Sequence, residues 1–421
     1  MIGLSRDQSN SLVLENKAGK KSVLRNRSFL FVLSGYSVSL LGNTFHSMAL
    51  NLWIIQTTGS AKLMSTVLIT HLLISMLFGS FAGTVADRMD RRTLMVIADV
   101  CRFFLVLGIV LLMVIPNTPF YLIILLTALI AFTSLFHAPS FQASLVDIVG
   151  KEQVYQAVGV LNIADNIVRI SGFALGGIAF AAFGGVFAIT VDAITFLLSA
   201  CLIYLAGKFP NPIKKSVEKK SFRDDFISGF RYLWHNPIAK SAVLLSPMLF
   251  LFFISSLMLI QVMAVQIWHA NPLEFGLIES CIPLGYVIGS GIILLLGSKL
   301  KSRGKWIIMS IMMMGPVYIL LSQVHSAALA LPFILIIGFL FSFSTLIINL
   351  SLRLEVNSEI QGRVFGTLGS LTSVAPPIGL AVSSIFSDLY GPSIVIVYCG
   401  FGILCMGVLS FIYLKSLRKY D

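Results

Sequence analysis

Six acidic or basic side chains interrupt the long apolar runs of this 421-residue chain. They are Asp99, Arg102, Asp165, Arg169, Asp192 and Glu279. A charged group in apolar surroundings loses its hydration, so it is retained where it pairs with an opposite charge or takes part in function. These residue types allow ion pairing and proton exchange, because a carboxylate that loses a neighbouring cation gains proton affinity.

Asp99 and Arg102 are three residues apart, which places both side chains on one face of a helix. They lie close to a strongly charged loop at residues 83–92. We interpret them as an internally neutralised pair whose role is structural and supports the wall of a cavity.

Asp165 and Arg169 are four residues apart, so they also share a helix face. Asn162 and Asn166 flank them and make this stretch unusually polar for an apolar run. We expect the stretch to face a cavity. Asp165 would exchange a proton there if Arg169 moved away from it.

Asp192 and Glu279 have no cation at helical spacing on their own runs. We expect Asp192 either to form a structural hydrogen bond with a neighbouring helix or to carry a proton. Glu279, near the end of its run, is either exposed to solvent or an unpaired carboxylate suited to proton coupling. Asp165, Glu279 and Asp192 are therefore the candidate proton-coupling residues, and His46, with Asn43 nearby, is a further cavity candidate.

The sequence predicts neither a metal site nor a cofactor. Its histidines and five cysteines lack the spacing of metal ligands. No G-x-x-x-x-G-K-[ST] loop is present, so ATP hydrolysis is not expected to supply energy. No catalytic constellation appears either, which predicts a protein that is not an enzyme.

Membrane-spanning helices are the elements expected to position these residues. The chain is 57% hydrophobic and 11% charged, whereas soluble domains carry about 25% charge. Its apolar runs have the length of roughly 20 residues that a helix needs to cross hydrocarbon, and they do not alternate as barrel strands do. We predict an all-α integral membrane protein with twelve spans, at residues 29–54, 63–86, 93–115, 119–142, 155–181, 185–207, 240–267, 275–298, 304–324, 328–351, 363–388 and 392–415.

A single long polar connection divides the chain into two halves of six helices. The predicted organisation is a tail at 1–28, a six-helix bundle at 29–207, a linker at 208–239, a second bundle at 240–416 and a tail at 417–421. Loops at matched places in the halves are similar, since "LVDIVGKEQ" and "RLEVNSEIQ" both carry an acid followed by V-x-x-E. Such internal duplication is typical of secondary transporters.

The distribution of basic residues predicts the orientation in the membrane. Nearly all of the 30 Lys and Arg fall in the tails, the linker and the loops on one side, and Lys62 alone lies in a loop on the other. By the positive-inside rule both termini are cytoplasmic. The net charge of +12 then reflects anchoring beside anionic lipid, and no nucleic-acid partner is predicted.

The loop "GTVADRMDRR" at residues 83–92 matches the pattern G-x-x-x-D-R-x-x-R-R. With the twelve spans and the linker, the chain resembles the major facilitator superfamily, whose signature lies between helices two and three. The stretches "FHAPSFQASLVDIVGKEQ", "RISGFALGG", "VDAITFLLSA" and "EIQGRVFG" resemble the branch of macrolide-efflux proteins and enterobactin exporters. The resemblance implies two pseudo-symmetric six-helix bundles.

Two motifs of the superfamily are incomplete here. On the fifth helix the glycines Gly172, Gly176 and Gly177 match the antiporter signature, while Phe173 replaces its proline and Val168 its first glycine. The arginine-led signature of the fourth helix is not evident.

In the family, the signature loop is part of a gate on the cytoplasmic side. Gly83 permits close approach of another helix, and Asp87 would meet the positive end of the eleventh helix when that side is closed. We expect Arg88, Arg91 and Arg92 to orient Asp87, bind lipid phosphate or anchor topology.

The resemblance implies a secondary transporter of the cell membrane that exports amphipathic small molecules, such as macrolide-like drugs, by alternating access and proton antiport. A carrier of a defined endogenous solute, such as a siderophore or lysophospholipid, is the alternative. A non-transporting sensor or scaffold would have no use for an intact signature loop. The expected partners are a small-molecule substrate, protons and membrane lipid, and the expected state is a monomer.

Overall fold

The computed structural model describes residues 22–86, 88–209, 222–357 and 360–421, and these residues form helices and the turns that join them. Eleven helices are long and apolar enough to cross a membrane. They are α2 (Arg27–Thr58), α3 (Ala61–Ala86), α4 (Arg91–Val114), α5 (Phe120–Val149), α6 (Val154–Leu205), α8 (Pro237–Gln266), α9 (Pro272–Leu296), α10 (Arg303–Leu321), α11 (Ala327–Glu355), α12 (Gln361–Tyr390) and α13 (Pro392–Tyr413). Four short helices complete the described elements: η1 (Val23–Arg25), α7 (Phe222–His235), η2 (Gly297–Lys299) and α14 (Lys415–Arg418).

Helix α6 contains two membrane passes. It is 52 residues long, whereas about 20 residues cross the hydrocarbon core. Gly184 interrupts it with φ +84° and ψ 169°, a conformation that glycine adopts and other residues avoid. The chain turns back at this glycine, so the eleven helices provide twelve passes. The prediction of an all-α membrane protein with two spans at 155–181 and 185–207 is confirmed.

Polar caps define where several of these helices begin. Asn26 accepts a hydrogen bond from the third residue of α2, and Asn236 caps α8 in the same way. At the start of α9, Asn271 and Glu274 form a reciprocal capping box. These side chains satisfy amide groups that the first turn of a helix leaves without partners.

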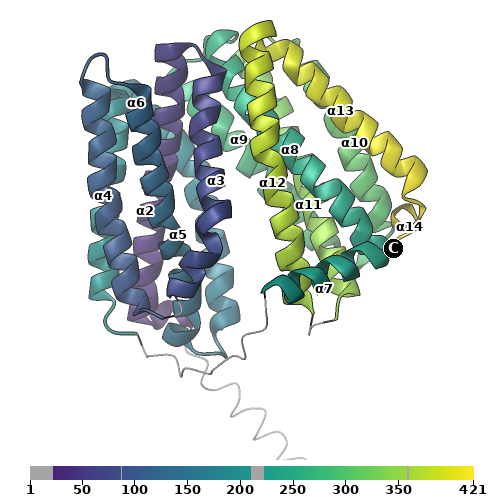
Figure 1. Cartoon of the computed structure of the whole chain (residues 1–421), viewed down its shortest axis with the longest axis horizontal. Coiled ribbons are helices and arrows are strands. Elements are labelled where there is room, and N and C mark those ends of the chain that lie inside the picture. Colours follow the sequence, from purple (N-terminus) through teal and green to yellow (C-terminus); the bar gives the residue numbers. More distant parts are fainter. Residues whose placement is uncertain (1–21, 87, 210–221, 358–359) are drawn as a thin grey trace, which may run out of the picture.

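The helices form two bundles, shown in Figure 1 as a purple-to-blue group of α2 to α6 and a green-to-yellow group of α8 to α13. Helix α7 falls inside the predicted linker and packs across the end of the second bundle against α12 and α8. Tyr232 of α7 donates a hydrogen bond to the backbone oxygen of Glu355. The tail at 1–21 and linker residues 210–221 lie outside the described residues.

We name the two ends of the molecule by the segments that lie there. The linker face is the end where α2 begins and α7 lies, and the far face is the end where α2 leads into α3. In Figure 1 the ribbons of α3 and α12 approach each other toward the far face and diverge toward the linker face. Bonds between the bundles agree with this view. Ser65 donates to Ser384 over 2.8 Å, and Gln266 donates to the backbone oxygen of Gly59 over 2.8 Å, both toward the far face.

Close packing of glycines joins the bundles between α6 and α9. A Cβ atom on Gly177 would lie 2.6 Å from the backbone oxygen of Pro272 and 3.1 Å from the Cα atom of Gly276. No larger residue fits at this crossing, so the contact depends on glycine. At the other end, a Cβ on Gly83 or Gly366 would meet no atom within 4 Å. The described parts of the bundles are therefore closed together at the far face and separated at the linker face.

Candidate transport cavity

A cavity of about 550 Å³ lies where the bundles separate, and we refer to it as the central cavity. Helices α2 to α6 supply nearly all of its lining, and Ile254 of α8 and Leu380 of α12 supply the rest. The first bundle therefore contributes all of the polar lining residues together with several apolar ones, and the second contributes two apolar side chains. The polar and ionisable lining residues are Tyr36, Ser39, Asn43, His46, Ser47, Asn51, His71, Arg102, Thr127, Ser134, His137 and Arg169.

His46 and Asp192 form a pair that connects the cavity to the protein interior. Nδ1 of His46 on α2 lies 3.0 Å from Oδ2 of Asp192 on the second leg of α6. The His46 side chain lines the cavity, whereas only 1% of the Asp192 side chain is exposed. Gly42, one turn before His46, leaves the space that the Thr195 hydroxyl and the Asp192 carboxylate fill. The partner of Asp192 thus comes from another helix, and it is a residue that can itself bind and release a proton.

A second buried cluster lies on the same side of the cavity. The Asp99 carboxylate contacts the Arg102 guanidinium along α4, and Nε2 of His137 on α5 lies 3.6 Å from Oδ2 of Asp99. The Arg102 guanidinium also lies 4.3 Å above the ring of Phe196. Charges of this cluster act electrostatically on Asp192. The pair expected from its spacing is therefore part of a network that extends over α4, α5 and α6.

Arg169 lines the cavity, and Asp165 on the same helix is its ion-pair partner. Nε of Arg169 donates to Oδ2 of Asp165 over 2.8 Å, and the Tyr36 hydroxyl donates to Oδ1 over 2.6 Å. Both carboxylate oxygens of Asp165 are therefore engaged. The Arg169 side chain is 47% exposed, so the remaining donors of its guanidinium are available to a bound molecule. The flanking Asn166 donates to the backbone oxygen of Asn162.

Glu279 lies outside this lining. It is half-buried on α9, close to the side chain of Gln261. Gln261 in turn accepts a hydrogen bond from Asn51 of the first bundle over 3.2 Å. Asp165, Asp192 and Glu279 thus occupy three separate polar clusters, and the structure brings none of them into contact with another.

The structure describes the three arginines of the charged loop after α3, whereas Asp87 lies outside the described residues. Arg91 pairs with Asp147 at the end of α5, and Arg92 donates to backbone oxygens at the end of α6, with its guanidinium 4.5 Å above the Tyr204 ring. These two arginines therefore contact protein groups of their own bundle. Arg88 is exposed.

The three glycines of the fifth span lie at helix contacts. A Cβ on Gly172 would collide with Thr44 of α2, and one on Gly176 would lie 3.4 Å from Phe45 of the same helix. Gly177 forms the contact with α9 described above. Their role in this structure is close packing around the cavity.

Several polar contacts had no sequence signal beyond the residue type. Tyr36, His71 and His137 line the cavity, yet a single such residue in an apolar helix does not reveal its partner. Asp90 caps α4 by accepting hydrogen bonds from the backbone amide and the hydroxyl of Thr93. This contact did have a sequence signal, because an aspartate just before the start of a helix is a preferred cap residue.

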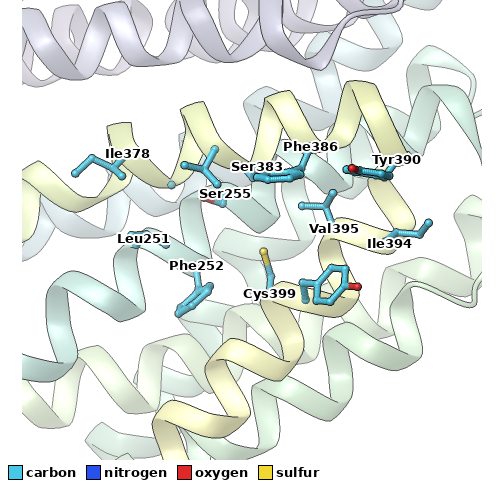
Figure 2. Close-up of a pocket in the computed structure, with 13 residues that line it drawn as sticks. Leu251, Phe252, Ser255, Ile378, Ser383, Phe386, Tyr390, Ile394, Val395 and Cys399 are labelled. Carbon is cyan, nitrogen blue, oxygen red and sulfur yellow. The ribbon is translucent and has the colours of Figure 1, made fainter.

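A second hollow, of about 610 Å³, lies in the other bundle among α8, α12 and α13, as Figure 2 shows. Its lining is apolar apart from hydroxyl and thiol groups, and it carries no charged side chain. Ile378, Tyr390 and Tyr398 are exposed, so the hollow lies at the surface of the bundle. Its chemistry differs from that of the central cavity.

Comparison with known proteins identifies the chain's family. The family profile described as "Transmembrane secretion effector" matches residues 18–384. An uncharacterised MFS-type transporter of Bacillus subtilis, YfiS, is 25% identical over 95% of this chain and 97% of its own. Macrolide efflux protein A of Streptococcus pyogenes is 23% identical over 93% and 97%. The enterobactin exporter EntS of Escherichia coli is 23% identical over 80% of each chain.

Solved structures show the same fold. An inward-facing bacterial homologue of the iron transporter ferroportin aligns with a TM-score of 0.72 and 15% identity, covering 94% of this chain and 100% of that one. An inward-facing bacterial homologue of the lysosomal transporter Spinster aligns with a TM-score of 0.71 and 14% identity, covering 96% and 98%. The chain therefore belongs to the transmembrane secretion effector family of major facilitator superfamily transporters, and it is a multi-pass membrane protein.

Proposed function

We propose that this transporter exports amphipathic small molecules across the cytoplasmic membrane by alternating access, in exchange for protons. The central cavity carries the proposal, because it lies between two bundles that are closed at the far face and separated at the linker face. The concentration of Lys and Arg supports a cytoplasmic linker face, with both termini on that side. In this conformation the cavity would open to the cytoplasm and would bind substrate from that side. One chain completes the cavity, which supports a monomer as the working unit.

The lining of the cavity supports an amphipathic substrate. Asn43, His46 and Arg169 offer hydrogen-bond donors on one wall, whereas Ile254 and Leu380 offer only hydrocarbon on the other. A molecule with a polar head and an apolar body would satisfy both walls. Macrolide efflux protein A and the multidrug efflux pump Tap, at 22–23% identity, support a drug-like cargo.

His46 and Asp192 are the proposed coupling pair. The partner of Asp192 is a histidine, a residue type that can bind and release a proton, whereas the partner of Asp165 is an arginine, which stays protonated. Glu279 lies outside the cavity lining and has no ion-pair partner among the described residues. A proton on Asp192 would remove its negative charge and weaken the attraction to His46, whereas a proton on His46 would add a positive charge and strengthen it. Either change alters the wall that the substrate contacts.

The first test measures accumulation of erythromycin and ethidium in a sensitive host with and without the transporter. We expect lower accumulation in expressing cells, and loss of this difference when a protonophore is added. Efflux that persists with the protonophore would contradict proton antiport.

The second test uses proteoliposomes with the probe that the cells export. Asp192→Asn is expected to abolish uptake driven by a pH gradient while it retains probe counterflow without a gradient, because counterflow needs no proton release. Asp165→Asn is the matched control and is expected to keep gradient-driven uptake. Normal gradient-driven uptake by Asp192→Asn would exclude the pair as the coupling site.

A carrier of one endogenous solute, such as a siderophore or lysophospholipid, is the second candidate. The similarity to the enterobactin exporter and the donor-rich wall of the cavity favour it. Absence of efflux for every xenobiotic tested, with normal expression, would favour this candidate over drug export.

A further inference from the structure

The N-terminus of α3 at the far face is bound by a carboxylate from the other bundle. Oδ1 of Asp388, on α12, accepts a hydrogen bond from the backbone amide of Ala61 over 2.7 Å. Oδ2 accepts from the hydroxyl of Ser60 over 2.8 Å and from the amide of Lys62 over 3.3 Å. A helix start presents unpartnered amides and positive potential, so a carboxylate is well suited to it.

The position of Asp388 is unfavourable within its own helix. It is two residues before Tyr390, the last residue of α12, where the carbonyl end of the helix repels an anion. The electrostatic interaction of Asp388 with α12 itself is therefore unfavourable. The favourable interaction comes from α3, across the interface between the bundles.

The same face of α12 makes a second bond to α3. Ser384 lies one turn before Asp388 and accepts a hydrogen bond from Ser65 over 2.8 Å. Both serine side chains are buried, so water competes little for this bond. Asp388 is exposed and can exchange its protein partners for water when the helices part. The buried contact aligns the two helices, and the exposed carboxylate can release.

We propose that Asp388 is a gate residue that holds the far face closed, and that its release from α3 accompanies opening to the far side. The proposal rests on alternating access as proposed above. All three hydrogen bonds of Asp388 cross the bundle interface, so they exist only while the far face is closed. Asp388 thus acts by setting the balance between the two cavity openings, without touching substrate.

Hydrogen exchange measured by mass spectrometry on the full chain in lipid nanodiscs tests this role. Asp388→Asn removes the charge and one acceptor oxygen. We expect amides at the start of α3 and of the adjoining loop, 59–66, to exchange about tenfold faster. We also expect slower exchange at residues 361–369 of α12 on the linker face. When the far face opens, the linker face closes, and the amides there become protected from solvent. This opposite change distinguishes a gate from a helix cap that merely frays.

Asp90→Asn is the matched control, because Asp90 also caps a helix N-terminus but lies in the same bundle as that helix. It is expected to speed exchange at the start of α4 and to leave residues 59–66 unchanged. Faster exchange at 59–66 in Asp388→Asn without protection at 361–369 would overturn the gate. Unchanged exchange at both places would also overturn it. Because no substrate or gradient is used, the result is independent of whether proton-coupled export is correct.

Discussion

Buried polar groups around the central cavity depend on partners from their own helix and from neighbouring helices. Asp99 is fully buried, and Arg102 neutralises it while His137 approaches from α5. A buried carboxylate without its cation is costly, since the charge has neither water nor a counter-charge. The network therefore shapes the wall on which His46 and Asp192 lie, and its integrity is a condition for the coupling that we propose.

We expect Arg102→Met to reduce stability by about 3–5 kcal/mol, because it removes the arginine that neutralises buried Asp99 and leaves only the side chain of His137 as an ionisable partner among the described residues. The melting temperature of the purified protein measures this loss. The double variant Asp99→Asn, Arg102→Met removes both charges and is expected to recover much of it. A single variant as stable as the wild type would show that the pair contributes nothing.

At the scale of elements, glycines decide where helices turn and where they touch. Gly184 reverses the chain between the two legs of α6, and Gly177 lets α6 meet α9 at Gly276. The same residue type serves different purposes at these sites. Gly184 supplies a backbone conformation, whereas Gly177 supplies the absence of a side chain.

Gly184→Ala is expected to lower stability by about 1–3 kcal/mol through backbone strain alone. A Cβ at this position would meet no atom within 4 Å, so collision does not contribute. Gly159→Ala is the matched control on the same helix, since its Cβ would also lie in open space and its backbone is helical. Thermal unfolding should show destabilisation in the first variant and none in the second.

At the scale of the whole molecule, the structure shows the two bundles in one relative arrangement, closed at one face and separated at the other. The bundles meet at the far face through Ser65, Ser384 and Asp388, and they are apart where Gly83 and Gly366 lie. The alternating access that we propose requires these relations to reverse. The helices α3 and α12 then carry the contacts that change, because they are neighbours at one end and separated at the other.

Gly83→Leu is expected to fold normally and to lose transport. The side chain has space in this conformation, but it would prevent close approach of the bundles at the linker face. Gly83→Ala adds only a methyl group and is expected to retain part of the activity. Probe efflux together with membrane expression measures both. Full efflux by Gly83→Leu would contradict closure at this residue.

The sequence by itself determined the local features of this protein. Continuous apolar runs predicted the spans because crossing hydrocarbon requires a helix of a certain length, and the break at Gly184 is adjacent to a predicted boundary. Spacings of three and four residues indicated the contacts of Asp99 with Arg102 and of Asp165 with Arg169, since helix geometry alone fixes them.

Only the tertiary structure decided which helices meet. Tyr36 and Asp165 are 129 residues apart, and Ala61 and Asp388 are 327 apart. No local spacing encodes such pairs, because they depend on the packing of whole helices. The histidine partner of Asp192, the protein partners of Arg91 and Arg92, and the closed far face are all of this kind. The residue types indicated that these polar and charged groups need partners, and the packing of the helices determined which partners they contact.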